Sequence, residues 1–262
     1  MRPATTDAIM KHFFTLLGHE LRMLLVSLST YIAAAAFLGF MGFVFTEILT
    51  HYSKAPQETS PARVFFELFW LPVFFMVPLL TMKCLAEERR LGTIETLLTT
   101  PVTTTEVVLA KYGAAYFMYV GLWGSTAGFF YLLHRFAGDM RFIDPGPLLG
   151  GYFFVALSGL LFVAIGVFAS SLSRSQAVAG ILCFTMLFAL VVGMRRLGDT
   201  AWFDRPGLET LRGAIDYAQI FTHRDDFTRG VIDTRHLLFY LSGTTLALIF
   251  SVLSVEARQL HS

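Results

Sequence analysis

The chain has 262 residues, of which 55% are hydrophobic and only 15% are charged, and its mean hydropathy is +0.62. Soluble domains carry about 25% charged residues, so this composition excludes an ordinary soluble protein and is typical of a membrane protein. The formal net charge of +1 gives no reason to expect a nucleic-acid partner or an acidic substrate.

Residues 8–24 are the first distinct segment and have the pattern of an amphipathic helix. Their apolar side chains recur at helical spacing, namely Met10, Phe13, Phe14, Leu17, Leu21 and Leu24. The segment is therefore predicted to lie in the membrane interface, although a plain N-terminal extension of the first span also fits. The residues that mark this interfacial helix are Phe13, Leu17, Glu20 and Arg22. The apolar run that follows starts too late and is too long for a signal peptide, so we expect it to be retained.

A membrane-spanning helix needs about 20 apolar residues. Six stretches qualify: residues 24–46, 64–83, 107–133, 148–171, 177–194 and 236–255. They predict an all-α membrane protein that forms a single transmembrane domain over residues 1–262. Pro72 and Pro78 predict kinks in the second stretch. Gly124 and Gly128 form a GxxxG in the third stretch, which either lets helices approach closely or reflects the frequency of glycine in membrane helices.

Six spans place both termini on the same side of the membrane. Three basic residues precede the first span and two follow it: Arg2, Lys11, Arg22, Lys54 and Arg63. This distribution favours termini in the cytoplasm by the positive-inside rule. The charge pattern is not clean, because seven basic residues lie between Arg195 and Arg235, on the side that this topology places outside.

The segment between the second and third stretches, LAEERRLGTIETLLTTPVTTTEVV at residues 85–108, is rich in charge. Apolar residues recur there at helical spacing, namely Leu91, Ile94, Leu97 and Leu98, and Pro101 ends the pattern. Thr103 and Glu106 have the spacing of a capping box that starts the next helix. A helix this short is marginal in water and must dock on something. It is either a cytoplasmic docking helix for a soluble partner or a charged anchor at the end of the second span.

The order of residues in this segment resembles the signature of ABC-2 type permeases. The matching residues are Glu87, Glu88, Arg89, Gly92, Thr93, Glu95, Leu97, Leu98 and Pro101, and the likeness continues through Val108, Leu109, Ala110, Lys111 and Tyr112. Two further regions carry the likeness, from His19 to Phe45 and from Phe227 to Ser242. Within that superfamily the chain looks most like the gliding-motility permease branch, to which the permease of nitrous-oxide-reductase maturation is related.

The resemblance implies that this segment is a cytoplasmic coupling helix that contacts a separate ABC ATPase subunit. The implied contact residues are Glu87, Glu88, Arg89, Arg90, Gly92, Thr93, Ile94, Glu95 and Leu98, followed by the cap residues Thr103 and Glu106. It also implies a multi-pass protein of the bacterial cytoplasmic (inner) membrane that acts as the permease of an exporter. One chain supplies half of the spans of such an assembly, so a homodimer or a heterodimer with a paralogous permease is implied.

The chain contains no G-x-x-x-x-G-K-[ST] motif, so we do not expect it to bind ATP or Mg²⁺ or to be an enzyme. ATP and Mg²⁺ belong to the partner ATPase. An intramembrane CAAX-type protease is disfavoured, because its Glu-Glu-x-x-x-Arg spacing fails where position 92 is glycine. A non-transporting subunit that uses ATP-driven motion to act on a periplasmic partner is the alternative function.

Residues 195–235 combine aromatic side chains with balanced charges. The resemblance suggests short helices in the outer leaflet here, which serve as an exit gate or as a docking surface for a periplasmic accessory protein. An ordinary interfacial loop with aromatic anchors is the alternative. The residues of interest in this outer loop are Phe227, Arg229, Gly230 and Asp233. Arg229 and Asp233 have the spacing of a helical ion pair.

The remaining polar residues suggest no further chemistry. The histidines lack the spacing of a metal site, so no metal is expected. Cys84 and Cys183 are interpreted as apolar fillers rather than as a disulfide. Glu67 lies near the outer end of its predicted span, where an interfacial position is favoured over a substrate contact.

Overall fold

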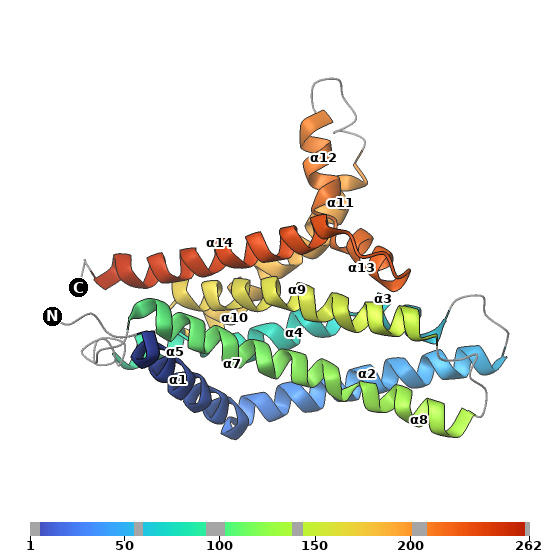
Figure 1. Cartoon of the computed structure of the whole chain (residues 1–262), viewed down its shortest axis with the longest axis horizontal. Helices are drawn as coiled ribbons and strands as arrows, with labels where there is room; N and C mark the ends of the chain where they lie inside the picture. The colour runs from blue at the N-terminus through green and yellow to red at the C-terminus, as the bar shows by residue number, and fades with distance from the viewer. Residues whose placement is uncertain (1–5, 55–59, 93–102, 138–143, 201–208, 260–262) are drawn as a thin grey trace.

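A computed structural model describes residues 6–54, 60–92, 103–137, 144–200 and 209–259, and within these ranges the regular structure is helical with no strand. The helices are α1 (Thr6–Val26), α2 (Leu28–Lys54), α3 (Pro61–Glu67), α4 (Trp70–Thr81), α5 (Ala86–Leu91), α7 (Thr104–Ser125), α8 (Ala127–Ala137), α9 (Pro145–Leu172), α10 (Gln176–Phe188), a π-helical turn η2 (Ala189–Gly193), α11 (Met194–Gly198), α12 (Glu209–Tyr217), α13 (Ile220–Thr228) and α14 (Thr234–Gln259). The long helices run side by side, and α1 begins at the same end of the bundle at which α14 ends (Figure 1).

Five segments of the described chain are long and apolar enough to cross a membrane. They are Leu28–Lys54, Trp70–Leu91, Pro145–Leu172, Gln176–Gly198 and Thr234–Ala257. The predicted third span, residues 107–133, is not among them, because the structure divides it into α7 and α8 at Thr126. The chain turns at Thr126, whose hydroxyl donates to the carbonyl oxygen of Trp123 at 2.6 Å and lies 2.9 Å from the hydroxyl of Tyr152.

Two other predicted spans are also interrupted. Ser27 separates the amphipathic α1 from α2, so the first span begins at Leu28 rather than at residue 24. The second stretch divides into α3 and α4 just before Pro72. Because Pro72 has no N–H, the carbonyl oxygen of Leu68 accepts from the N–H of Leu71 instead, at 3.2 Å. The interruption that Pro72 predicts therefore lies one turn before it, whereas α4 continues through Pro78.

The central helix of the bundle is α9, which packs against α4, α7, α10, α13 and α14. Asp144 caps its first turn by accepting from the N–H of Gly146 at 3.1 Å. The surrounding core is dominated by aromatic side chains, with Phe66, Phe69 and Phe154 completely or almost completely buried. Cys84 and Cys183 are buried free thiols in this core, which confirms their interpretation as apolar fillers.

The segment between the fifth and sixth predicted spans contains short helices. Figure 1 shows α11 and α12 projecting sideways from the bundle, while α13 lies back against it. The predicted helical ion pair of Arg229 and Asp233 is wrong, because α13 ends at Thr228 and Gly230 takes a positive φ of 81°. Asp233 instead accepts from the N–H of Arg235 at 2.8 Å, which helps to start α14.

The close approach of α13 to α9 depends on Gly150. A Cβ atom added at Gly150 would overlap the carbonyl oxygen of Phe227, which is backbone and cannot rotate away. We expect Gly150→Ala to destabilise the protein by about 1–3 kcal/mol, as overpacking does elsewhere. The thermal unfolding midpoint of the purified protein in detergent measures this effect.

Gly39→Ala is the matched control, because Gly39 also lies within a helix but has nothing within 4 Å of an added Cβ. Alanine has the higher helix propensity, so this control should leave the unfolding midpoint unchanged or raise it. Equal midpoints for the two variants would contradict the packing described for Gly150.

Candidate functional site

The end of the bundle where α1 begins carries the short helix α5, which a turn joins to α4. The first N–H groups of a helix have no partner within the helix. Here the hydroxyl of Ser170, from α9, accepts from the N–H groups of Leu85 and Ala86 at 3.0 and 3.1 Å. The same hydroxyl donates to the carbonyl oxygen of Met82 at 3.3 Å. A side chain of the central helix therefore fixes the start of α5.

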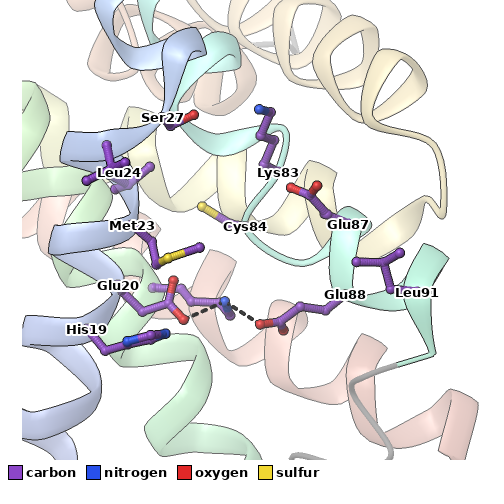
Figure 2. A pocket seen from close by; sticks show the side chains of 12 residues that line it. His19, Glu20, Met23, Leu24, Ser27, Lys83, Cys84, Glu87, Glu88 and Leu91 are labelled. Atoms are coloured by element: carbon purple, nitrogen blue, oxygen red, sulfur yellow. Dashed lines mark hydrogen bonds and ion pairs between the residues drawn. The ribbon is translucent and has the colours of Figure 1, made fainter.

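Lys111 of α7 holds α5 from a second side. Its ammonium lies 2.7 Å from a carboxylate oxygen of Glu88 on α5 and 2.8 Å from one of Glu20 on α1. The Lys111 side chain is only 5% exposed, so its charge must be matched by nearby carboxylates. Figure 2 shows Glu20 and Glu88 extending toward each other from opposite sides of a pocket.

A third contact joins α5 to the last helix. The guanidinium of Arg89 donates to the carbonyl oxygen of Ser254 on α14 at 3.0 Å. The Ser254 hydroxyl in turn donates to the carbonyl oxygen of Ser171 at 3.1 Å. Glu87 and Arg90 make a looser ion pair of 3.9 Å on the exposed side of α5. We call the contacts of Lys111, Glu20, Glu88, Arg89 and Ser170 the α5 network.

The α5 helix ends at Leu91 and is capped by Gly92, which has a φ of 70° and donates its N–H to the carbonyl oxygen of Glu88. The predicted contact residues Thr93, Ile94, Glu95 and Leu98 lie outside the described residues. At the start of α7, the Glu106 N–H donates to the Thr103 hydroxyl at 3.3 Å. The Thr103 N–H donates back to the Glu106 carboxylate at 2.7 Å, so a capping box starts α7.

The four residues that mark the predicted interfacial helix lie on α1 but do not share one environment. Leu17 faces α7, where its side chain would lie 3.0 Å from a Cβ added at Gly113. Glu20 joins the α5 network, whereas Arg22 is exposed. The apolar side of α1 thus packs partly on α7. Ser170 and Ser254 were not predicted from the sequence, and Lys111 was noted only as part of the family likeness, although a lone lysine within an apolar stretch is a signal for a functional residue.

The outer-loop residues lie elsewhere, around α13. Phe227 is buried against Phe154, whereas Arg229 and Gly230 are exposed in the turn that follows. Arg224 anchors α13 by donating to the carbonyl oxygen of Glu67 at 3.2 Å. The structure therefore separates the predicted outer-loop residues into one core residue and an exposed turn.

Two histidines whose rings are in contact, tilted by 34° to each other, join α13 to α14. The ring centroids of His223 and His236 are 4.0 Å apart, and His236 lies 3.0 Å from a carboxylate oxygen of Asp226. His223 is 1% exposed and contacts the Tyr240 hydroxyl at 3.1 Å and the Tyr217 carbonyl oxygen at 2.9 Å. Burial lowers the pKa of the His223 imidazole from its ordinary 6.5 to about 4, and the neighbouring His236 acts in the same direction.

The described residues contain no group of three or more His, Cys, Asp or Glu side chains that could hold a metal ion. Residues 46–201, more than half of the chain, match the model of a family described as ABC-2 family transporter protein. The matched region runs from α2 to α11 and includes Glu88, Lys111 and Ser170. A comparison with curated proteins finds no match.

The α5 network predicts how substitution of Lys111 affects stability. Lys111→Met would leave the carboxylates of Glu20 and Glu88 in a partly buried site without their shared counter-charge. We expect a loss of about 3–5 kcal/mol, the usual cost of removing one partner of a buried pair. Thermal unfolding in detergent measures the loss. A triple variant that adds Glu20→Gln and Glu88→Gln should recover most of it; a triple variant as unstable as Lys111→Met would argue against the ion pairs.

His223 predicts a pH dependence. Because its pKa is lower in the folded chain, the unfolded chain takes up a proton between about pH 6.5 and pH 4 while the folded chain does not. Stability should therefore fall as the pH is lowered through this window and should level off below it. His223→Gln can still donate to Tyr217 and accept from Tyr240 without titrating, so its unfolding midpoint should depend less on pH. His51→Gln, at an exposed position on α2, is the control and should keep the slope of the unsubstituted protein.

Proposed function

The chain belongs to the ABC-2 family of transporter proteins and is a permease component of an ABC transporter, and we propose that it transmits the motion of a separate ATPase subunit to an exported substrate. The observation that carries the proposal is the α5 network. Its contacts join α5 to α1 and α7 through Lys111, to α9 through Ser170 and to α14 through Arg89. A force on α5 must move these helices together or break buried polar contacts, which is costly.

The ATPase contact is proposed at α5 and the residues that follow it. Its described members are Glu87, Glu88, Arg89, Arg90 and Gly92. Thr93, Ile94, Glu95 and Leu98 complete the proposed surface, with the cap of Thr103 and Glu106 behind it. ATP and Mg²⁺ are bound by the partner, because the sequence of this chain has no phosphate-binding loop.

We propose that α7 and α8 together make the sixth membrane crossing. Figure 1 supports this, because α7 begins near α5 and α8 ends toward the opposite end of the bundle, where α9 begins. Together with the five candidate spans of the described chain, this crossing gives an even number of membrane crossings. An even number agrees with a bundle in which α1 begins and α14 ends on one side. That side is the cytoplasm if α5 meets the ATPase there, and the membrane is proposed to be the bacterial inner membrane.

A second permease chain, identical or paralogous, is proposed to complete the assembly. Exposed apolar side chains on α10, such as Ile181 and Phe188, provide surface for lipid or for this second chain. The match is to the ABC-2 family as a whole, and nothing in it favours the gliding-motility branch. The alternative function, mechanical action on a periplasmic partner, draws support from α11 and α12, which project from the bundle with Leu211 54% exposed.

Gly92 provides a test of the proposed ATPase contact. Gly92 and Gly230 both have positive φ, and nothing lies within 4 Å of a Cβ added at either, so alanine strains the backbone similarly at both. Gly92→Ala changes how the chain leaves α5 and should weaken recovery of the ATPase subunit with the tagged permease at least several-fold. ATPase activity in the reconstituted complex should fall with it.

Gly230→Ala is the matched control, because it places the same strain between α13 and α14, away from α5. It should retain the ATPase at the level of the unsubstituted protein. Equal recovery of the ATPase by both variants would place the contact somewhere other than α5.

A further inference from the structure

A cavity of about 460 Å³ opens between α1 and the turn that joins α4 to α5. Its lining has a polar part and an apolar part. The polar part includes His19, Lys83 and Glu87, and the apolar part includes Met23, Leu24 and Val26. Figure 2 shows Lys83 and Glu87 on the same side of this space, and Met23 and Leu24 across from them on α1. The proposed contact of α5 with an ATPase does not account for the apolar part.

The apolar part continues into an exposed rim at the corner between α1 and α2. Met23 is 59% exposed, Val26 is 76% exposed and Leu28 is 74% exposed. Apolar side chains at this exposure, on an amphipathic helix next to a membrane span, are suited to the region where lipid chains begin. The rim therefore favours an occupant with a hydrocarbon chain over a soluble protein.

The charges of the cavity favour a particular headgroup. The ammonium of Lys111 is already shared by Glu20 and Glu88. Lys83 has no carboxylate within ion-pair distance among the described residues. Among the described residues, the ion pair of Glu87 is the 3.9 Å contact with Arg90, and because their side chains are 37% and 58% exposed this pair is weak. Within the described part of the chain, Lys83 and Glu87 are thus the cation and the carboxylate of this lining that can pair with a ligand.

We propose that this cavity binds a phospholipid whose headgroup carries a primary ammonium group, as in phosphatidylethanolamine, from the leaflet on the side of the termini. The lipid phosphate pairs with Lys83, the ammonium donates to Glu87, and an acyl chain follows Met23 and Val26. A choline headgroup has no N–H to donate to Glu87. A glycerol headgroup, as in phosphatidylglycerol, has no cationic group to pair with Glu87. The net negative charge of that lipid would be repelled by the carboxylates that line the cavity. The bound lipid joins α1 to the α4–α5 turn.

Native mass spectrometry of the purified full chain in mild detergent tests this proposal. Phosphatidylethanolamine, phosphatidylcholine and phosphatidylglycerol with identical acyl chains are added at equal concentration. We expect phosphatidylethanolamine to bind about tenfold more tightly than the other two, the effect of one charge-assisted hydrogen bond. Glu87→Gln should remove the preference over phosphatidylcholine, and Lys83→Ala should weaken binding of all three lipids.

Glu47→Gln and Lys54→Ala are the matched controls, because they remove the same charges from exposed positions on α2, toward its far end. They should leave the preference unchanged. Glycerophosphoethanolamine, which has the headgroup without acyl chains, should bind at least tenfold more weakly than the lipid. Equal binding of the three lipids, or a preference that survives Glu87→Gln, would overturn the proposal. Lipid binding is measured on the permease chain without an ATPase subunit. The result therefore tests the lipid proposal independently of the proposed function.

Discussion

A lysine ammonium that is almost completely removed from water is stable only with opposite charge beside it, and the α5 end of the bundle is organised by this constraint. Lys111 draws Glu20 and Glu88 from two other helices to within 2.8 Å and 2.7 Å. Because Glu88 is on α5, the constraint also determines how α5 lies against α7 and α1. Ser170 and Arg89 then fix α5 to α9 and α14. A helix of six residues, too short to be stable alone, is therefore held on several sides.

The same reasoning explains where the long helices are interrupted. Buried backbone groups must find partners, and in lipid there is no water to supply them. At Pro72 the missing N–H is compensated by a tighter turn between Leu68 and Leu71. At Thr126 the side-chain hydroxyl donates to the carbonyl oxygen of Trp123, in the preceding turn. The same hydroxyl is hydrogen-bonded to the hydroxyl of Tyr152. Aromatic side chains of neighbouring helices are in contact beside both of these breaks, Phe69 with Phe154 and Phe130 with Tyr152, so these two breaks are part of the core packing.

Local patterns predicted the fold better than they predicted the site. The predicted stretch 148–171 lies within α9 (Pro145–Leu172), because a long continuous apolar run is by itself enough to indicate a membrane-spanning helix. The turn at Thr126 was not predicted. The Thr126 hydroxyl is hydrogen-bonded to Tyr152 of α9, and no local sequence pattern connects these two residues. The residues Glu87 to Gly92 were singled out by a family resemblance, and Glu20 and Lys111 lie in regions that carry it, but the contact between them was not predicted. Lys111 and Glu20 are 91 residues apart, and Leu85 and Ser170 are 85 apart, so no local spacing connects them.

The cap on α5 has a consequence for how the protein is made. During synthesis, Glu20 and Glu88 leave the ribosome before Lys111, so their counter-charge arrives as soon as α7 inserts. The hydroxyl that caps α5 arrives only with Ser170, 85 residues after Leu85, and the carbonyl of Ser254 arrives later still, with the last helix. The contacts that hold α5 therefore form in steps as the chain is made. The last of them, between Arg89 and Ser254, forms only when α14 has joined the bundle. A chain that stalls before its last helix would lack the contact of Arg89 with Ser254 and would leave α5 without one of its anchors.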